Sequence, residues 1–186
     1  MRFLIEDAQE PWTWPEDYFD FIHIRHMVGA IGDWRTLYRQ VFTHIKPGGW
    51  YQHCDFDIQT RSDTGLVGPD HVFNRWCELQ FEAAEKAGRS LKYPIENGQM
   101  KNLMEETGFV DVVQRSWKIP IGGWMSDKRM KHVGLFALEY LDSALEGFAL
   151  QPLSEMMGWE YEKIVEIQQV LRGALRRSRL QPYFTL

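Results

Sequence analysis

The chain has 186 residues, of which 44% are hydrophobic and 25% are charged, so it is long enough for one domain and too apolar for bulk disorder. Its formal net charge of −5 disfavours binding to nucleic acid through overall charge, and its two cysteines are too few for a disulfide scaffold. No apolar run has the length of a membrane helix and the N-terminus lacks the features of a signal peptide, which favours a cytoplasmic protein without nucleic-acid or membrane partners.

The first third of the chain alternates between strand-like and helix-like patterns. Residues 19–24 have the sequence FDFIHI, an aromatic and β-branched run that is typical of a strand. Asp33 can cap a helix that carries Leu37 and Val41 on one face, and Pro47 with the two following glycines ends it. In chain order, these patterns predict a short strand at 2–5, a loop at 7–18, a strand at 19–24, a helix from 33 and a strand at 50–56.

Helical periodicity dominates the rest of the chain. Asp70 can open a helix that Gly88 ends, and Met130, Val133 and Ala137 begin the spacing of a long helix. The predicted elements are helices at 70–87, 97–107, 127–147 and 159–175, with strands at 109–118 and 183–186. Strands that alternate with helices in the first half predict an α/β fold with a largely parallel sheet, and the two long C-terminal helices should lie on or above it.

Aromatic side chains are unusually frequent, with 11 Phe, 8 Trp and 7 Tyr. A heavily aromatic core accounts for such rings, and an apolar small-molecule pocket is the alternative, because such pockets are lined mainly by apolar and aromatic groups. The candidate pocket walls are Trp34, Trp50, Trp76, Trp117, Trp124 and Tyr140, and of these we expect Trp34, Trp117, Trp124 and Tyr140 to contact the substrate.

Polar side chains gather at the ends of the two predicted parallel strands. His23, Arg25 and His26 close the first strand, and His53 and Asp55 close the second. Ligands of open α/β sheets bind beyond the carboxyl ends of strands, so we expect His23, Arg25 and His53 to be catalytic. His26 and Asp55 are expected to contact the substrate, and His53 and Asp55 could converge with His23 into an acid–base group. The alternatives are a satisfied core histidine, an ion pair of Arg25 with a nearby acid, and ordinary strand-end polarity.

The remaining reactive residue types give no further site. No set of His, Cys, Asp and Glu has metal-ligand spacing, so we expect no metal, and no Gly-x-Ser-x-Gly turn marks a nucleophile. Cys54 alternates away from His53, and nothing in the pattern makes it a nucleophile. The arginines near the end of the last predicted helix complement its dipole and favour a solvated face over an anion site. They are Arg172, Arg176, Arg177 and Arg179.

Several short motifs follow one another in a fixed order. They are Asp20-Phe-Ile-His-Ile-Arg25, Asp33-Trp34, Ile45-Lys-Pro-Gly-Gly-Trp50, Gly108-Phe-Val-Asp-Val112 and Pro120-Ile-Gly-Gly-Trp124. In this order they resemble class I S-adenosylmethionine-dependent methyltransferases, and most closely the fungal LaeA-like branch that is tied to secondary metabolism. The resemblance implies an incomplete Rossmann-like sheet with helices on both faces and added C-terminal helices. It also implies a single domain over 1–186, in which 1–60 form the sheet core, 61–178 the mainly helical substrate side and 179–186 a final strand.

One feature of that family has no counterpart in the sequence. The family has a glycine-rich turn after its first strand, where any Cβ would block the approach of the backbone to the cofactor. Residues 3–8 resemble the end of the family's third strand, and Asp7 with Ala8 matches the pair that meets the adenine; a surface or turn acid is the alternative for Asp7. We therefore expect an N-terminally truncated chain without a cofactor, because the S-adenosylmethionine site is lost.

The resemblance and the missing turn lead to three hypotheses on function. The first is a cofactor-independent cyclase of pericyclic, Diels–Alder type that folds a polyketide-like precursor between aromatic walls and polarises it with a hydrogen-bond donor. The second is a methyltransferase completed by a partner subunit, and the third is a non-catalytic binding module. The substrate is expected to be small and hydrophobic. Loss of the family's first strand bares the edge of the strand at 19–24, so we also expect a homodimer or a higher homo-oligomer.

Overall fold

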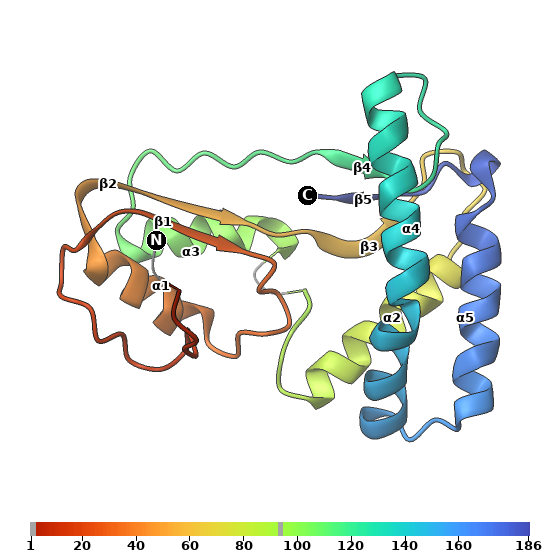
Figure 1. Ribbon diagram of the computed structural model, residues 1–186, viewed down its shortest axis with the longest axis horizontal. Helices are drawn as coiled ribbons and strands as arrows, with labels where there is room; N and C mark the ends of the chain where they lie inside the picture. The colour runs from red at the N-terminus through yellow and green to blue at the C-terminus, as the bar shows by residue number, and fades with distance from the viewer. Residues whose placement is uncertain (1–2, 93–94) are drawn as a thin grey trace. The chain divides into compact units, whose positions relative to one another are not determined.

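A computed structural model describes residues 3–92 and 95–186, and the contacts within the chain divide it into two units. Unit 1 comprises Met1–Asp55 and Lys92–Arg115, and unit 2 comprises Phe56–Leu91 and Ser116–Leu186. The α/β class predicted from the sequence is confirmed, because both units combine a small sheet with helices (Figure 1). The organisation as a single domain stays a prediction.

Unit 1 is built on two parallel strands, β1 (Phe19–Arg25) and β2 (Ile45–Cys54). Helix α1 (Trp34–His44) connects them, and it begins where the sequence predicts, because the Asp33 side chain accepts a hydrogen bond from the Thr36 N–H at 3.1 Å. Helix α3 (Gln99–Thr107), preceded by the 3-10 turn η1 (Glu96–Gly98), packs against α1.

The core of unit 1 lies between this pair of helices and one face of the sheet. Its buried members are Ile31, Trp34, Leu37, Tyr38 and Leu103. The opposite face of the sheet leaves Phe21 54% and Trp50 72% exposed. Parallel sheets are ordinarily covered on both faces, so unit 1 by itself satisfies only half of that requirement.

Unit 2 contains three antiparallel strands in the order β3-β5-β4, together with three long helices (Figure 1). The strands are β3 (Asp57–Arg61), β4 (Lys118–Pro120) and β5 (Tyr183–Thr185), the helices are α2 (Val72–Lys86), α4 (Lys128–Gln151) and α5 (Tyr161–Leu175), and the short turns are η2 (Pro152–Met156) and η3 (Ser178–Leu180). The three helices and η2 bury a large apolar cluster that includes Phe73, Leu145, Leu153, Ile164 and Leu171.

A glycine sets how closely α4 approaches the end of β4. A Cβ on Gly134 would lie 2.1 Å from the carbonyl oxygen of Gly122, a distance that no side chain tolerates. The Gly122 N–H donates a 2.7 Å hydrogen bond to the Gly134 carbonyl, so the two backbones are in direct contact. Only glycine at position 134 allows α4 to sit at this depth.

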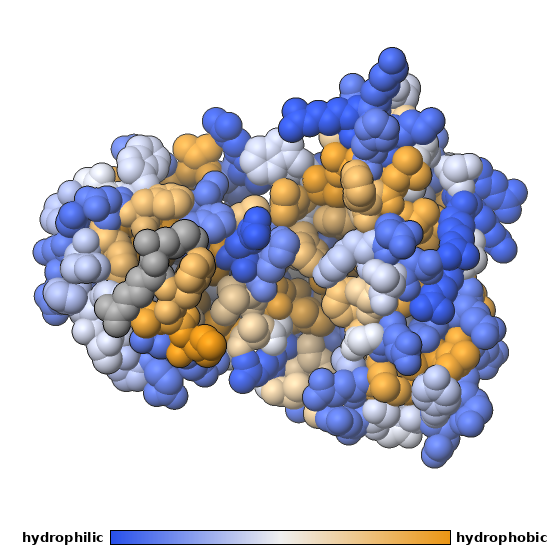
Figure 2. Space-filling model, in the orientation of Figure 1, coloured by the Kyte–Doolittle hydropathy of each residue, from blue (hydrophilic) through white to orange (hydrophobic). Residues whose placement is uncertain are grey.

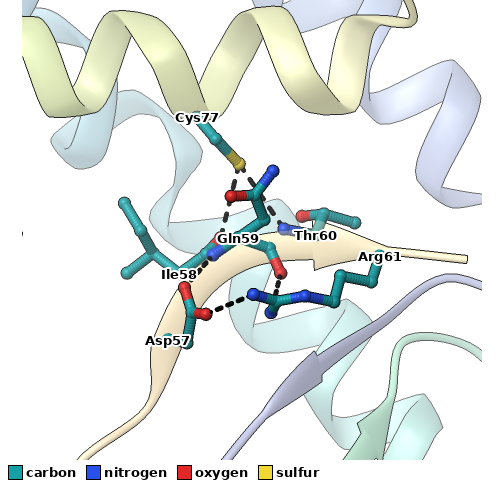
Figure 3. A network of polar contacts seen from close by, with 6 residues as sticks. All are labelled: Asp57, Ile58, Gln59, Thr60, Arg61 and Cys77. Carbon is teal, nitrogen blue, oxygen red and sulfur yellow. Dashed lines mark hydrogen bonds and ion pairs between the residues drawn. The ribbon is translucent and has the colours of Figure 1, made fainter. Parts of the chain in front are cut away.

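A buried thiol joins α2 to β3, as Figure 3 shows. Cys77 Sγ lies 3.5 Å from the Ile58 carbonyl oxygen and accepts the Thr60 N–H at 3.5 Å. In the same strand Arg61 forms a 2.5 Å ion pair with Asp57. Burial raises the pKa of the Cys77 thiol, which therefore stays protonated and acts as a structural hydrogen-bonding group.

Two predicted strands differ in the structure. Residues 3–5 form no strand, and Arg2 lies outside the described residues. Of the strand predicted at 109–118 only the last residue lies in β4, and Val110 and Val113 are 83% and 74% exposed. The sequence predicts one largely parallel sheet. In the structure only β1 and β2 pair in parallel, and β3, β5 and β4 form a separate antiparallel sheet. None of the helices in the described part of the chain is long and apolar enough to cross a bilayer.

Candidate functional site

The carboxylate of Asp55 ties together the carboxyl ends of β1 and β2. Its Oδ2 accepts the backbone N–H groups of Met27 at 2.8 Å and Val28 at 3.1 Å, and lies 3.2 Å from His53 Nε2. Because a carboxylate can only accept, His53 Nε2 carries the hydrogen in this contact. The loop that follows β1 is thereby fixed to the end of β2.

His53 is the second member of this buried group, and its side chain is fully buried. Its Nδ1 accepts a hydrogen bond from the Tyr38 hydroxyl at 2.5 Å, and its ring stacks on Trp34 with 4.9 Å between centroids. The ring of Tyr51 meets Tyr38 edge-on at 5.4 Å. Burial, together with the neighbouring Tyr38, raises the pKa of Tyr51. The Tyr51 hydroxyl and the His53 ring nitrogens are therefore polar atoms buried among aromatic rings.

Asp55 stays charged although its side chain is buried. Burial alone would raise the pKa of this carboxyl, but the hydrogen bonds from His53 and from the Met27 and Val28 N–H groups outweigh it and lower the pKa below the ordinary value of 3.8. A charged carboxylate whose Oδ2 has three hydrogen-bond partners makes the end of the sheet rigid. That rigidity is what a site built on the loop after β1 requires.

The backbone of His26 has an uncommon conformation at this point. Its φ is +56°, and its N–H donates to the Cys54 carbonyl oxygen at 3.3 Å. Histidine tolerates the left-handed region better than most residues, but the conformation still needs support from its surroundings. The Asp55 contacts to the next two residues supply that support.

Only two of the three residues of the predicted acid–base group lie together. His53 and Asp55 do lie together, but His53 pairs in register with Ile24, which faces the helices, whereas His23 lies one residue away on the opposite face. The expected convergence of His23 with His53 is therefore wrong, because adjacent residues of a strand point to opposite faces. His23 and Arg25 are both exposed on the face that α1 does not cover. Their catalytic role stays a prediction.

The remaining predicted pocket walls occupy two settings. Trp34 is 3% exposed in the core of unit 1, where it supports the ring of His53. Trp117, Trp124 and Tyr140 belong to unit 2, where Trp124 Nε1 donates to the Pro182 carbonyl oxygen at 3.0 Å, and Trp117 and Tyr140 are each 53% exposed. Their role as substrate walls stays a prediction.

A groove of about 680 Å³ runs along β1 in unit 1. Three acidic side chains are followed by two indole rings in the segment that forms its outer wall, and Phe19, Phe21 and His23 contribute from the strand. The outer wall consists of Leu4, Glu6, Asp7, Ala8, Glu10, Pro11, Trp12, Thr13 and Trp14. Such a combination of rings and a few carboxylates is typical of a small-molecule site.

Helix α1 holds this outer wall in place. Gln40 Oε1 accepts the Trp12 backbone N–H at 2.7 Å, and the Trp12 indole N–H donates to the Ala8 carbonyl oxygen at 3.0 Å. The Gly32 N–H donates to Gln9 Oε1 at 2.8 Å, which ties the wall to the loop after β1. The groove wall and the Asp55-bound loop are thus two sides of one hydrogen-bonded assembly.

Sequence reasoning missed the groove and the contribution of Gln40 and Tyr38. The segment at 7–18 is correctly predicted as a loop, but nothing in its pattern indicates that it lies along β1. Tyr38 follows Trp34 by four residues and faces the same way, a spacing that could have linked it to the strand beneath. Within residues 3–92 and 95–186 there is no cluster of three His, Cys, Asp or Glu that could hold a metal ion.

Comparison with known proteins finds methyltransferases and regulators of secondary metabolism. Residues 3–114 match the family described as "Methyltransferase domain". Methyltransferase pytC of Aspergillus terreus is 30% identical over 184 residues, which cover 99% of this chain and 56% of that protein. Secondary metabolism regulator LAE1 of Cochliobolus heterostrophus is 29% identical over 178 residues, which cover 95% of this chain and 56% of that protein. The chain therefore spans about half the length of the curated relatives it matches.

A solved structure shows a weaker likeness. The phosphoethanolamine N-methyltransferase 2 of Haemonchus contortus, in complex with S-adenosylhomocysteine, aligns over 96% of this chain and 34% of its own, with 16% identity and a TM-score of 0.48.

The expectation that the S-adenosylmethionine site is lost is wrong. The family match begins at residue 3 and takes in the groove wall with Asp7 and Ala8, both parallel strands and the loop that Asp55 holds. The expectation depended on one absent glycine-rich turn. The matched residues also line the groove along β1, with Glu6, Asp7 and Glu10 among them.

Proposed function

Because the chain belongs to the methyltransferase domain family, we propose that it serves the transfer of a methyl group from S-adenosylmethionine to a small, apolar acceptor of secondary metabolism. Fungal relatives named for methyl transfer and for the regulation of secondary metabolism support this assignment. A cytoplasmic location stays a prediction.

The groove along β1 is the observation that carries the proposal. The sequence resemblance assigns Asp7 and Ala8 to the adenine end of the cofactor, and both residues line the groove. Its volume of about 680 Å³ lies within the range of small-molecule sites. The rings of Trp12 and Trp14 offer apolar surface to a purine, and the carboxylates suit the hydroxyl groups and the positive charge of the methyl donor. When bound, S-adenosylmethionine supplies an electrophilic methyl group.

The residues of the chain have separate tasks in this proposal. Asp7 accepts hydrogen bonds from the nucleoside, and Gln40 holds the wall that carries it. Asp55 keeps the loop after β1 rigid, so that the acceptor meets a fixed surface. His23 lines the groove and is exposed, which makes it the group available to take a proton from an acceptor hydroxyl.

Calorimetric titration of the full chain with S-adenosylhomocysteine tests the proposal without turnover. We expect micromolar binding, weakened about tenfold by Asp7→Asn, which keeps an oxygen for the local turn but removes the charge. The matched control is Glu16→Gln, an exposed acid outside the groove, which should leave the affinity unchanged. Absence of binding by the wild-type chain, or equal loss in both variants, would contradict the proposal.

Regulation of secondary metabolism is the second candidate function, because a regulator is among the relatives that match 95% of the chain. The two candidates differ in the acceptor. Incubation with a tritiated methyl donor and a fungal extract should place the label in small organic molecules if the first is right, and in protein if the second is right. Cyclisation of a polyketide-like precursor stays a prediction, and a linear polyene incubated with the chain tests it directly.

A further inference from the structure

The groove along β1 has an uneven balance of charge. Its lining includes three carboxylates, those of Glu6, Asp7 and Glu10, and no lysine or arginine. On the strand that borders the groove, Asp20 forms a 2.7 Å ion pair with Lys46, so the charge of that lysine is balanced by an acid that does not line the groove. A groove with this lining favours a ligand that carries a positive charge over an anionic one.

The three carboxylates differ in how they are bonded. Asp7 Oδ1 accepts the Gln9 backbone N–H at 2.9 Å, so this carboxylate is held in the local turn. The side chains of Glu6 and Glu10 are exposed and form no ion pair with any residue that the structure describes. The net positive charge of S-adenosylmethionine balances only one of the three carboxylates. Negative charge is therefore left over for a second ligand in the groove.

Aromatic rings line the strand side of the same groove. Trp14 lies edge-on to Phe19, with 5.4 Å between the ring centroids. Phe21 stacks on His23 at 6.2 Å and is 54% exposed, so part of its ring surface is free. Such rings bind an apolar body and attract a cation near their faces. Figure 2 shows the same mixture on the surface of unit 1, at the left, where hydrophobic residues adjoin strongly hydrophilic ones.

We propose that the groove takes an acceptor with a protonated amine on an aromatic or apolar body, and that Glu6 and Glu10 bind the ammonium group. The inference rests on the proposed function, which places the methyl donor in the same groove, and it narrows the small, apolar acceptor to a cationic one. Trp14 and Phe21 contact the body of this molecule, and His23 stays available to its hydroxyl group. An acceptor with a carboxylate or a phosphate is disfavoured, because the groove presents like charge to it.

Three probes of similar size and different charge test the amine. Tyramine is a cation at neutral pH, tyrosol is neutral and 4-hydroxyphenylacetate is an anion, and all three keep a phenol hydroxyl. Calorimetric titration of the full chain in about 20 mM salt should rank them in this order, with tyramine bound about tenfold more tightly than tyrosol. Salt at about 0.5 M should reduce this preference to about threefold or less, because exposed charges are screened. Equal affinity for tyramine and tyrosol, or tighter binding of the anion, would overturn the proposal.

A double variant tests the two glutamates. Glu6→Gln combined with Glu10→Gln removes two charges at nearly constant volume, and should weaken tyramine binding about tenfold. Tyrosol binding should not change, which shows that the groove of the variant is intact. The matched control combines Glu16→Gln with Asp17→Asn, two exposed acids of the same loop that do not line the groove, and should alter neither affinity. Equal loss of tyramine binding in both double variants would overturn the proposal, because net charge alone would then explain the preference.

Titration with S-adenosylhomocysteine in the same buffer separates this inference from the proposed function. We expect the chain to bind S-adenosylhomocysteine and to prefer tyramine. Binding of S-adenosylhomocysteine without a preference for tyramine would overturn the cationic acceptor and leave methyl transfer standing. A preference for tyramine without binding of S-adenosylhomocysteine would support the amine site and contradict methyl transfer alone.

Discussion

In unit 1, the deepest polar group consists of Asp55 and His53, whose side chains are 3% and 0% exposed and which hydrogen-bond to each other and to a loop. In unit 2, the described buried polar residues are uncharged, namely Thr60, Gln80 and Gln168, and the large core cluster is apolar. Unit 1 therefore depends on a few directional contacts to hold its site, whereas unit 2 depends on close packing.

This difference predicts different responses to mutation and pH. The packing of unit 2 should be sensitive to added volume, because its large core cluster is apolar and contains no carboxylate. The hydrogen-bonded end of unit 1 should tolerate small changes in volume but lose stability when its carboxylate is protonated.

Gly134→Ala should destabilise unit 2 by about 3 kcal/mol, because its new Cβ collides with the Gly122 carbonyl oxygen and α4 must move away from β4. Urea unfolding followed by circular dichroism measures the change. Gly173→Ala in α5 is the matched control, since a Cβ there meets no atom within 4 Å and should stabilise the chain by up to about 1 kcal/mol. Equal effects of the two substitutions would contradict the tight approach of α4.

Asp55→Asn should destabilise unit 1 by about 2 kcal/mol at neutral pH, because the charged acceptor of two backbone N–H groups and His53 is lost. The pKa of Asp55 is lower in the folded chain than its ordinary value of 3.8, so its contribution is complete above that value and lost as the pH falls through the folded pKa. The difference between wild type and variant in the free energy of unfolding should therefore shrink at pH 3.

Urea unfolding at pH 6 and pH 3 measures that difference. Asp20, Asp33 and Asp63 also have lowered pKa values, but they are present in both proteins and cancel from the comparison. A gap between the two proteins that stays constant over this range would show that the carboxylate charge of Asp55 does not stabilise the fold.

Local signals explain what the sequence predicted well. Asp33 and Asp127 were expected to begin helices, and each side chain caps the helix that follows, because a cap needs only residues within one turn. The strand predicted at 109–118 failed for the opposite reason. Strand formation needs a partner distant in sequence, and Val110 and Val113 find none within unit 1.

The candidate site was likewise predictable only where local signals define it. Alternation along one strand correctly places His53 and Asp55 together. It cannot relate His23 to them, because that requires the register between β1 and β2. The groove depends on Gln40 reaching a loop residue 28 positions earlier, a contact that no local pattern encodes.

Gln40→Ala should have the smallest effect, about 1 kcal/mol. It removes the acceptor of the Trp12 N–H and a long 3.5 Å donor to the Ala8 carbonyl oxygen, and it leaves the other hydrogen bonds of the wall in place. Amide hydrogen exchange of residues 8–14 should accelerate about fivefold, and the affinity for S-adenosylhomocysteine should fall by a similar factor. Arg39→Ala, the exposed neighbour on α1, is the control and should change neither quantity. Faster exchange without weaker binding would show that the wall does not contact the ligand and that the cofactor binds elsewhere. Unchanged exchange would show that unit 1 is held less by single directional contacts than its contrast with unit 2 implies.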